Sequence, residues 1–190
     1  GKVVKVAGLV VEGQGPGAGI GSTCNISNGQ GKDLLSEVVG FKDSRIMLMP
    51  YGEMRGIHPG CKISLVHDKP FVPVGDNYLG RIVDGFGDPL DGKGPIQANV
   101  HYPLYGQVVN PMQRRSIKEV TDVGVGVINS LITLGRGQRV GIMSGSGVGK
   151  SVLMGMMARH TSADVSVVAL IGERGREVKD FVELTLGPDG

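Results

Sequence analysis

Residues 143–151 of this chain read MSGSGVGKS, and their types and spacing suit the binding of a phosphate group. Glycines allow backbone N–H groups to converge on an anion, and a lysine supplies a point charge for the terminal phosphates of a nucleotide. A serine hydroxyl beside that lysine can ligate Mg²⁺, and a helix that begins there offers its positive N-terminal end. The stretch therefore predicts a nucleotide phosphate-binding loop.

The loop differs by one residue from the usual GxxxxGK[ST] pattern, because Ser144 stands in place of the first glycine. Ser144 is small, so we expect it to be tolerated where a strand passes into the loop. The alternative is a flexible Gly/Ser linker with an unrelated lysine. We expect Ser151 to ligate Mg²⁺ and the following residues to bind the nucleotide: Ser144, Gly145, Ser146, Gly147, Val148, Gly149, Lys150, Ser151 and Val152.

The segments around the loop predict a β-α-β unit. Residues 139–143 read as a short buried strand, and residues 151–159 as a helix whose apolar side chains pack into a core. Residues 165–171 are rich in β-branched residues, which predicts a second strand, buried on both faces of a parallel sheet. Ligands of such sheets bind at the carboxyl ends of the strands, so the residues after 171 are expected near the phosphates.

The residues that follow the second predicted strand include Glu173 and Arg174. A carboxylate in this place can orient a water molecule for attack on a γ-phosphate, and an arginine can offset charge on the transferred oxygens. We therefore expect Lys150, Glu173 and Arg174 to be the catalytic residues. The alternative is a solvated loop with a helix cap, and Arg176 and Glu177 are assigned to a helix start or an interface.

The chain divides into two parts by its patterning. Residues 1–72 contain short β-rich runs separated by turn clusters, which predicts a small antiparallel β-barrel; these runs are 3–11, 21–26, 37–41, 45–49 and 61–66. Residues 73–190 are expected to form the phosphate-binding domain, and residues 70–111 to contain few regular elements. A Ser-x-x-Glu pattern predicts a helix that begins at Ser116, and a further helix is expected over residues 176–186.

Composition argues against several other classes of function. The net charge is +2, and the chain has four Phe, four Tyr and no Trp, so the basic surface and stacking rings of nucleic-acid binders are lacking. Cys24 and Cys61 are isolated, which suits a reduced cytosolic chain with both residues in the core. The four histidines lack metal-ligand spacing, and no apolar run approaches the roughly 20 residues of a membrane span.

The residues that carry this chemistry are similar to those of a known family. GRGQRVGIMSGSGVGKS (135–151) followed by LIGERGREVKDF (170–181) resembles the flagellar and type III protein-export ATPases, relatives of the catalytic subunits of rotary ATP synthases. The resemblance extends to LGRIVDGFGDPLDG (79–92) and NPMQR (110–114). Ser116, Gly126 and Ser144 depart from the family pattern.

That resemblance implies a β-barrel followed by a truncated, RecA-like parallel-sheet P-loop domain. It implies hydrolysis of ATP with Mg²⁺, coupled to export of flagellar or type III secretion substrates. The implied assembly is a cytoplasmic homo-hexamer, peripheral to an inner-membrane export gate, that meets export substrates, chaperones and regulators and no nucleic acid. Relatives complete their site with residues that lie outside these 190, so we expect the 190 residues alone to hydrolyse ATP poorly and to form no stable ring.

Three other functions fit the same outline. An ATP-synthase-type catalytic subunit would associate with a membrane rotor, and a hexameric RNA translocase would show RNA-stimulated turnover. A nucleotide-sensing module would retain ATP without releasing phosphate.

Overall fold

A computed structural model describes residues 1–29, 31, 33–145 and 147–187. By contacts within the chain it divides into two compact units, Gly1–Val108 and Val109–Gly190. Among the described residues, no helix is long and apolar enough to cross a bilayer.

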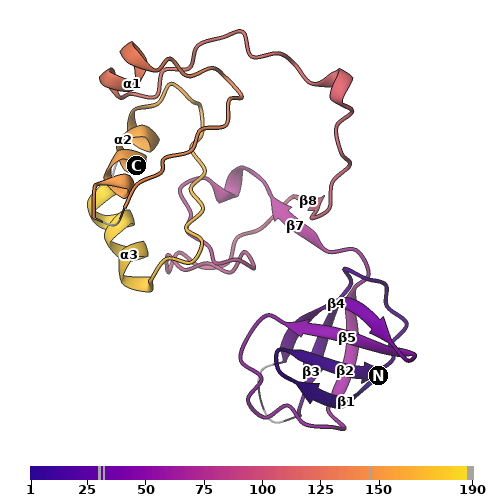
Figure 1. The fold of residues 1–190 in the computed structure, drawn as a ribbon. Helices are drawn as coiled ribbons and strands as arrows, with labels where there is room; N and C mark the ends of the chain where they lie inside the picture. The colour runs from indigo at the N-terminus through magenta and orange to yellow at the C-terminus, as the bar shows by residue number, and fades with distance from the viewer. Residues whose placement is uncertain (30, 32, 146, 188–190) are drawn as a thin grey trace. The chain divides into compact units, whose positions relative to one another are not determined.

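The first unit begins with a closed antiparallel barrel (Figure 1). Within the described residues, the strands follow one another around it in the order β1-β2-β5-β4-β3-β6, and Lys2 pairs with Lys62 where β1 meets β6. Closure leaves the sheet without a free edge, which protects its backbone groups from pairing with other chains. The strands are β1 (Lys2–Ala7), β2 (Val10–Gln14), β3 (Thr23–Ser27), β4 (Leu34–Lys42), β5 (Arg45–Pro50) and β6 (Lys62–His67).

The barrel core follows from the two-residue period of its strands, which sends alternate side chains inward. In β3, Cys24 and Ile26 are fully buried, with the half-buried Asn25 between them. Both cysteines are free and lie in this core, as predicted. The buried cluster consists of Val3, Val11, Cys24, Ile26, Val38, Ile46, Leu48, Cys61 and Ile63.

The predicted barrel is confirmed, but one of its runs was read wrongly. Residues 3–11 were expected to form a single β-rich run, whereas the chain turns back at Gly8 and Leu9 to make the β1–β2 hairpin. Gly8 has a φ of 61°, a left-handed conformation that glycine adopts without steric cost. The turn therefore divides what reads as one run in the sequence.

After the barrel, residues 68–108 contain few regular elements, as expected. A two-stranded ribbon pairs β7 (Phe71–Val74) with β8 (Val100–Pro103), and a 3₁₀ turn, η1, covers Asp76–Tyr78. In the loop between them, Arg81 Nε donates to Asp91 Oδ2 at 2.6 Å and Arg81 Nη2 donates to Asp91 Oδ1 at 3.0 Å. This bidentate ion pair closes the turn that contains the family-like residues 79–92.

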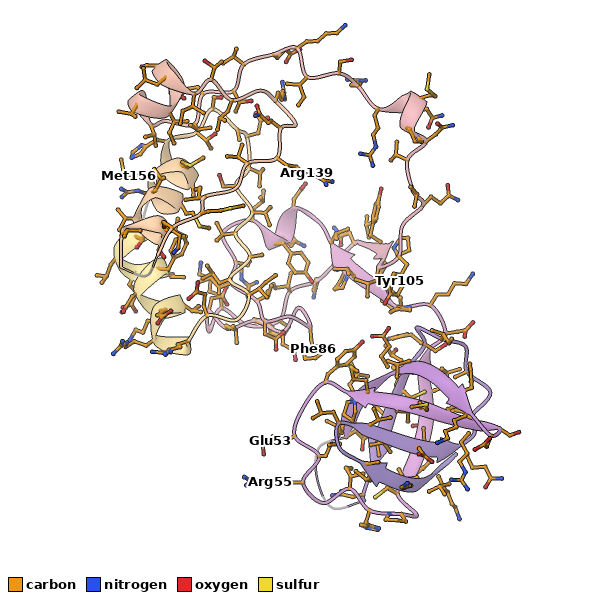
Figure 2. The ribbon with its side chains drawn as sticks, viewed as in Figure 1. Glu53, Arg55, Phe86, Tyr105, Arg139 and Met156 are labelled. Atoms are coloured by element: carbon orange, nitrogen blue, oxygen red, sulfur yellow. The ribbon has the colours of Figure 1, made fainter. Side chains whose placement is uncertain are left out.

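A single carboxylate joins the barrel to the segments that follow it. Glu37 on β4 accepts hydrogen bonds from the hydroxyl of Tyr51 at 2.7 Å and from that of Tyr105 at 3.0 Å. The Tyr51 ring also meets Phe86 edge-on, with ring centroids 5.5 Å apart. Phe86 and Tyr105 are labelled in Figure 2. These contacts hold two post-barrel segments against the barrel wall.

The second unit contains short helices joined by extended segments (Figure 1). Its elements are η2 (Pro111–Gln113), α1 (Gly126–Leu131), α2 (Lys150–His160), α3 (Gly175–Asp180) and the π-helical η3 (Phe181–Leu186). The helix predicted after the loop is confirmed as α2. The helix predicted over residues 176–186 is confirmed as α3 and η3, which follow each other without interruption.

The helix predicted to begin at Ser116 is wrong. Ser116 lies outside every helix and strand, and Val120 forms an isolated antiparallel bridge with Gly135. Arg136 N donates to Glu119 O at 2.8 Å, so the backbone of the predicted capping box pairs with a distant turn. A partner far along the chain has overridden a local helix signal.

The two predicted strands 139–143 and 165–171 are also wrong as individual elements. Both segments lie outside every strand and bridge of the described residues. A β-strand exists through ladder hydrogen bonds to a neighbour, and here neither segment has one. Many of their apolar side chains are consequently exposed, including Val167 at 91% and Ile171 at 89%.

The apolar face expected on the helix after the loop is not a core face here. Val152 and Met156 are exposed, and Leu153 and Met157 are half-buried. Met156 is labelled on α2 in Figure 2. The buried residue of α2 is Gly155, which packs against η3.

Candidate nucleotide-binding site

The phosphate-binding loop takes its shape from two glycines. Gly147 has a φ of 76°, and Gly149, the N-cap of α2, has a φ of 96°. A side chain at either position would meet nothing within 4 Å, so the backbone conformation, and not lack of space, requires glycine. Ser146 lies outside the described residues.

Lys150, the first residue of α2, folds back over the start of the loop. Its Nζ donates to the carbonyl oxygens of Ser144 at 2.8 Å and Gly145 at 2.7 Å. Both acceptors are uncharged, and Lys150 has no ion-pair partner among the residues that the structure describes. The positive charge of the ammonium group is therefore not balanced by an ion pair with a described residue.

The far end of α2 is anchored to the segment before α1. Ser162 N donates to Asp122 O at 2.9 Å, and the Thr161 hydroxyl donates to the same oxygen at 3.0 Å. The Asp122 carboxylate accepts from Gly124 N at 2.7 Å and from Asn129 Nδ2 at 2.6 Å. These bonds fix the helix that begins at the loop.

A pocket of about 180 Å³ lies where the start of α2 meets the segment before α3. Ser151 and Met154 line it from α2, and Glu173, Glu177 and Phe181 line it from the other side. The structure thus brings together Ser151 and Glu173, two of the residues singled out from the sequence. Lys150 and Arg174 are not among the lining residues, and Val148 and Val152 are exposed.

Glu173 is paired with a second carboxyl group. A hydrogen bond with Glu177 is the main cause that raises the pKa of Glu173; partial desolvation and the like charge of Glu177 add to it, and Lys150 opposes it. Two carboxyl groups this close disfavour simultaneous ionisation, which explains the direction of the shift. The pocket therefore holds an acidic pair in place of a single acid.

Glu177 is the functional candidate that the sequence interpretation missed, because it was assigned to a helix start or an interface. The signal was present: Glu173 and Glu177 are four residues apart across the start of α3, a spacing that brings side chains together on a helix. Arg174 is the N-cap of α3 with an exposed side chain, so its predicted catalytic role stays a prediction.

Both parts of the chain are similar to domains of one known protein family. Residues 3–65 match the ATP synthase alpha/beta family, beta-barrel domain, and residues 124–190 match the nucleotide-binding domain of the same family. The chain belongs to the ATP synthase alpha/beta family. The two matched domains of this family correspond to the barrel and to the part of the chain that holds the loop and the pocket.

Within the ATP synthase alpha/beta family, the chain is similar along its whole length to flagellar and secretion ATPases. It is 47% identical to the flagellum-specific ATP synthase of Pseudomonas aeruginosa and 50% identical to that of Treponema pallidum. It is 44% identical to the type 3 secretion system ATPase of Xanthomonas euvesicatoria. The chain covers 43% of the length of each of these relatives.

Solved structures agree with this assignment. The assembled ATPase EscN of the enteropathogenic E. coli type III secretion system matches with a TM-score of 0.84 and 36% identity, over 95% of this chain and 43% of EscN. EscN in complex with its central stalk EscO matches equally well. The expected fold class, a small antiparallel barrel followed by a truncated P-loop domain, is therefore confirmed, as is the resemblance to the export ATPases.

Proposed function

We propose that this chain is the barrel and phosphate-binding part of an ATPase whose hydrolysis of ATP drives export of flagellar or type III secretion substrates. The observation that carries the proposal is that Ser151 and Glu173 line one pocket beside the loop of Lys150. The names of the similar proteins, flagellum-specific ATP synthase and type 3 secretion system ATPase, support the export role.

In this proposal residues 144–152 bind the nucleotide. The backbone amides of the loop and the N-terminal end of the 11-residue α2 face the β- and γ-phosphates. Lys150 exchanges its two carbonyl acceptors for phosphate oxygens, which are better partners because they are charged. Lys150 thus neutralises part of the phosphate charge.

The side-chain oxygens of the pocket suit Mg²⁺ as ligands, because Mg²⁺ is a hard cation that prefers oxygen ligands and keeps several waters. The Ser151 hydroxyl would hold it together with phosphate oxygens, and the Glu173 and Glu177 carboxyl oxygens lie in the same pocket. When bound, the ion supplies charge neutralisation on the transferred phosphoryl group.

Glu173 has the chemistry of a base that orients the attacking water. Its raised pKa strengthens its basicity, and it lines the same pocket as Ser151, which supports this role. Arg174, next to it, would offset charge on the transferred oxygens once its exposed side chain turns toward the nucleotide.

For the whole protein we propose a homo-hexamer in the cytoplasm, peripheral to the inner-membrane export gate. Its partners would be export substrates, chaperones and regulators of the secretion apparatus. The matched EscN structures, one assembled and one with a central stalk, support an oligomer with a regulatory partner. Residues 1–72 would form the barrel domain and residues 73–190 the beginning of the ATPase domain.

Two substitutions in the full-length protein test this function. Lys150→Ala should abolish nucleotide binding, because it removes the loop's only side-chain cation, whereas Glu173→Gln should retain binding and lose turnover. Binding is measured by titration with a fluorescent ATP analogue, and turnover by phosphate release. Retained hydrolysis in Glu173→Gln would place the base elsewhere, and stimulation of the wild type by RNA would favour a translocase.

A further inference from the structure

Gly155 lies in the middle of α2 at an unusually close approach between two helices. An ideal Cβ at this position would overlap the methyl group of Thr185 on η3, and it would lie 3.3 Å from the Thr185 Cβ and 3.4 Å from the Thr185 carbonyl oxygen. The backbone of Gly155 is helical and the residue is buried. Glycine is therefore required here because there is no room for a Cβ atom, although glycine destabilises a helix interior relative to alanine.

The Gly155–Thr185 contact lies one helical turn beyond the pocket on both helices. Gly155 is one turn after Ser151 on α2, and Thr185 is one turn after Phe181, whose side chain is 5% exposed and lines the pocket. Ser151 and Met154 face Glu177 and Phe181, and Gly155 faces Thr185, so α2 and the α3–η3 helix run in the same direction. The two elements lie side by side in Figure 1.

We propose that the Gly155–Thr185 contact sets the distance between the phosphate-binding helix and α3, the helix that contains Glu177 and directly follows Glu173. Gly155 is then a positioning residue for Glu173 and Glu177, and it touches neither nucleotide nor metal. This inference rests on the proposed function, since it assigns a purpose to the spacing of that site.

The physical argument is one of close packing. Carbon atoms pack at about 3.5–4.0 Å, so a methyl group at position 155 must push η3 away from α2. Because α3 and η3 are continuous, the displacement moves the acidic pair away from Ser151. Misplacement of a reacting group by about 1 Å costs up to about 100-fold in rate.

The test is a double-mutant cycle in the full-length protein with Gly155→Ala, Thr185→Ala and the two combined. For Gly155→Ala we expect kcat to fall about 10- to 100-fold, while the Kd for a non-hydrolysable ATP analogue stays within about three-fold. Thr185→Ala should keep wild-type turnover. The combined variant should recover most of the lost kcat, because the overlapping methyl group is gone.

Gly126→Ala is the matched control. Gly126 lies at the start of α1, and a Cβ there would meet nothing within 4 Å, so this variant should have wild-type kcat and melting temperature. The control separates an effect of the added methyl group from an effect of glycine replacement in general.

The outcomes distinguish this inference from the function on which it rests. If Glu173→Gln abolishes turnover but Gly155→Ala has wild-type kcat, the positioning role alone is overturned. If Gly155→Ala loses nucleotide binding and turnover together and Thr185→Ala restores neither, the contact is merely structural and the inference also fails. If Glu173→Gln hydrolyses ATP normally, the proposed function fails and the positioning role fails with it.

Discussion

Glu173 and Glu177 behave as one acidic unit, which changes the pH dependence expected of the site. In the proposed mechanism Glu173 is the base, and a base must be ionised to act, so we expect activity to fall as pH drops through the pKa of Glu173. The hydrogen bond with Glu177 raises that pKa, and the acidic limb of the pH profile therefore lies at a higher pH than for an isolated glutamate.

Substitution Glu177→Gln should shift the acidic limb of the kcat/KM profile to lower pH. The neutral amide keeps the shape of the side chain. It replaces the carboxylate that accepts a hydrogen bond from protonated Glu173 by a group that can donate to the ionised form, and it removes the like charge, so both changes favour ionisation of Glu173. The measurement is phosphate release by the full-length protein across the acidic range. Glu183→Gln is the control, because Glu183 pairs with Lys179 on the exposed side of the same helix and should leave the limb unmoved. An unmoved limb in Glu177→Gln would contradict the pairing.

Among the elements, the loop at residues 79–92 depends on one buried ion pair. The side chains of Arg81 and Asp91 are 13% and 4% exposed, and Asp91 also accepts from the backbone of Lys93 and Ile82. The Arg81 hydrogen bond is the main reason that the pKa of Asp91 lies well below its usual range. Asp91 is therefore a charged acceptor that joins the two ends of the turn.

Asp91→Asn should lower the melting temperature of the chain by several degrees at neutral pH. A carboxylate whose pKa is depressed in the folded state stabilises above its unfolded pKa of about 3.9 and loses that contribution as pH falls toward the folded pKa. The gap between wild type and Asp91→Asn should therefore narrow below about pH 4, as followed by circular dichroism. A gap that is constant over this range would argue against the ion pair.

The exposed pair Glu53–Arg55, labelled in Figure 2, is a matched control for that experiment. Its atoms are 3.2 Å apart, but the side chains are 91% and 79% exposed for Arg55 and Glu53. Solvent and salt screen such pairs, so Glu53→Gln should leave the melting temperature nearly unchanged.

On the scale of the whole molecule, the stretch of sequence that spans the boundary of the two units is exposed throughout. All residues from 101 to 120 are exposed, and they include Arg114, Arg115 and Lys118. Extended, solvent-exposed backbone opens to a protease at little cost, whereas the strands of a closed barrel do not.

Limited trypsin digestion of the 190-residue chain should therefore cut first at Arg114, Arg115 or Lys118. The expected product is a resistant fragment that contains the barrel, identified by mass spectrometry. An Arg114→Gln, Arg115→Gln, Lys118→Gln variant should slow its appearance. Early cleavage within the barrel, for example at Lys42 or Lys62, would contradict this division of the chain.

The sequence was sufficient for those features that arise from local chemistry. Gly147 and Gly149 permit the left-handed turns of the loop, a helix follows the loop within one residue of the start predicted at Ser151, and the two-residue alternation of the barrel strands places Cys24 and Ile26 in the core. Each of these depends on neighbours within a few residues, so residue type and spacing alone indicate them.

Features that depend on a distant partner could be read only in three dimensions. The strands expected at 139–143 and 165–171 have no ladder partner in the described chain, and Glu119 pairs with Arg136 in place of opening a helix. Glu177 joins the pocket, and Gly155 meets Thr185, because two helices pack closely. Such contacts join residues far apart in the chain, and a local pattern does not encode which surfaces will meet.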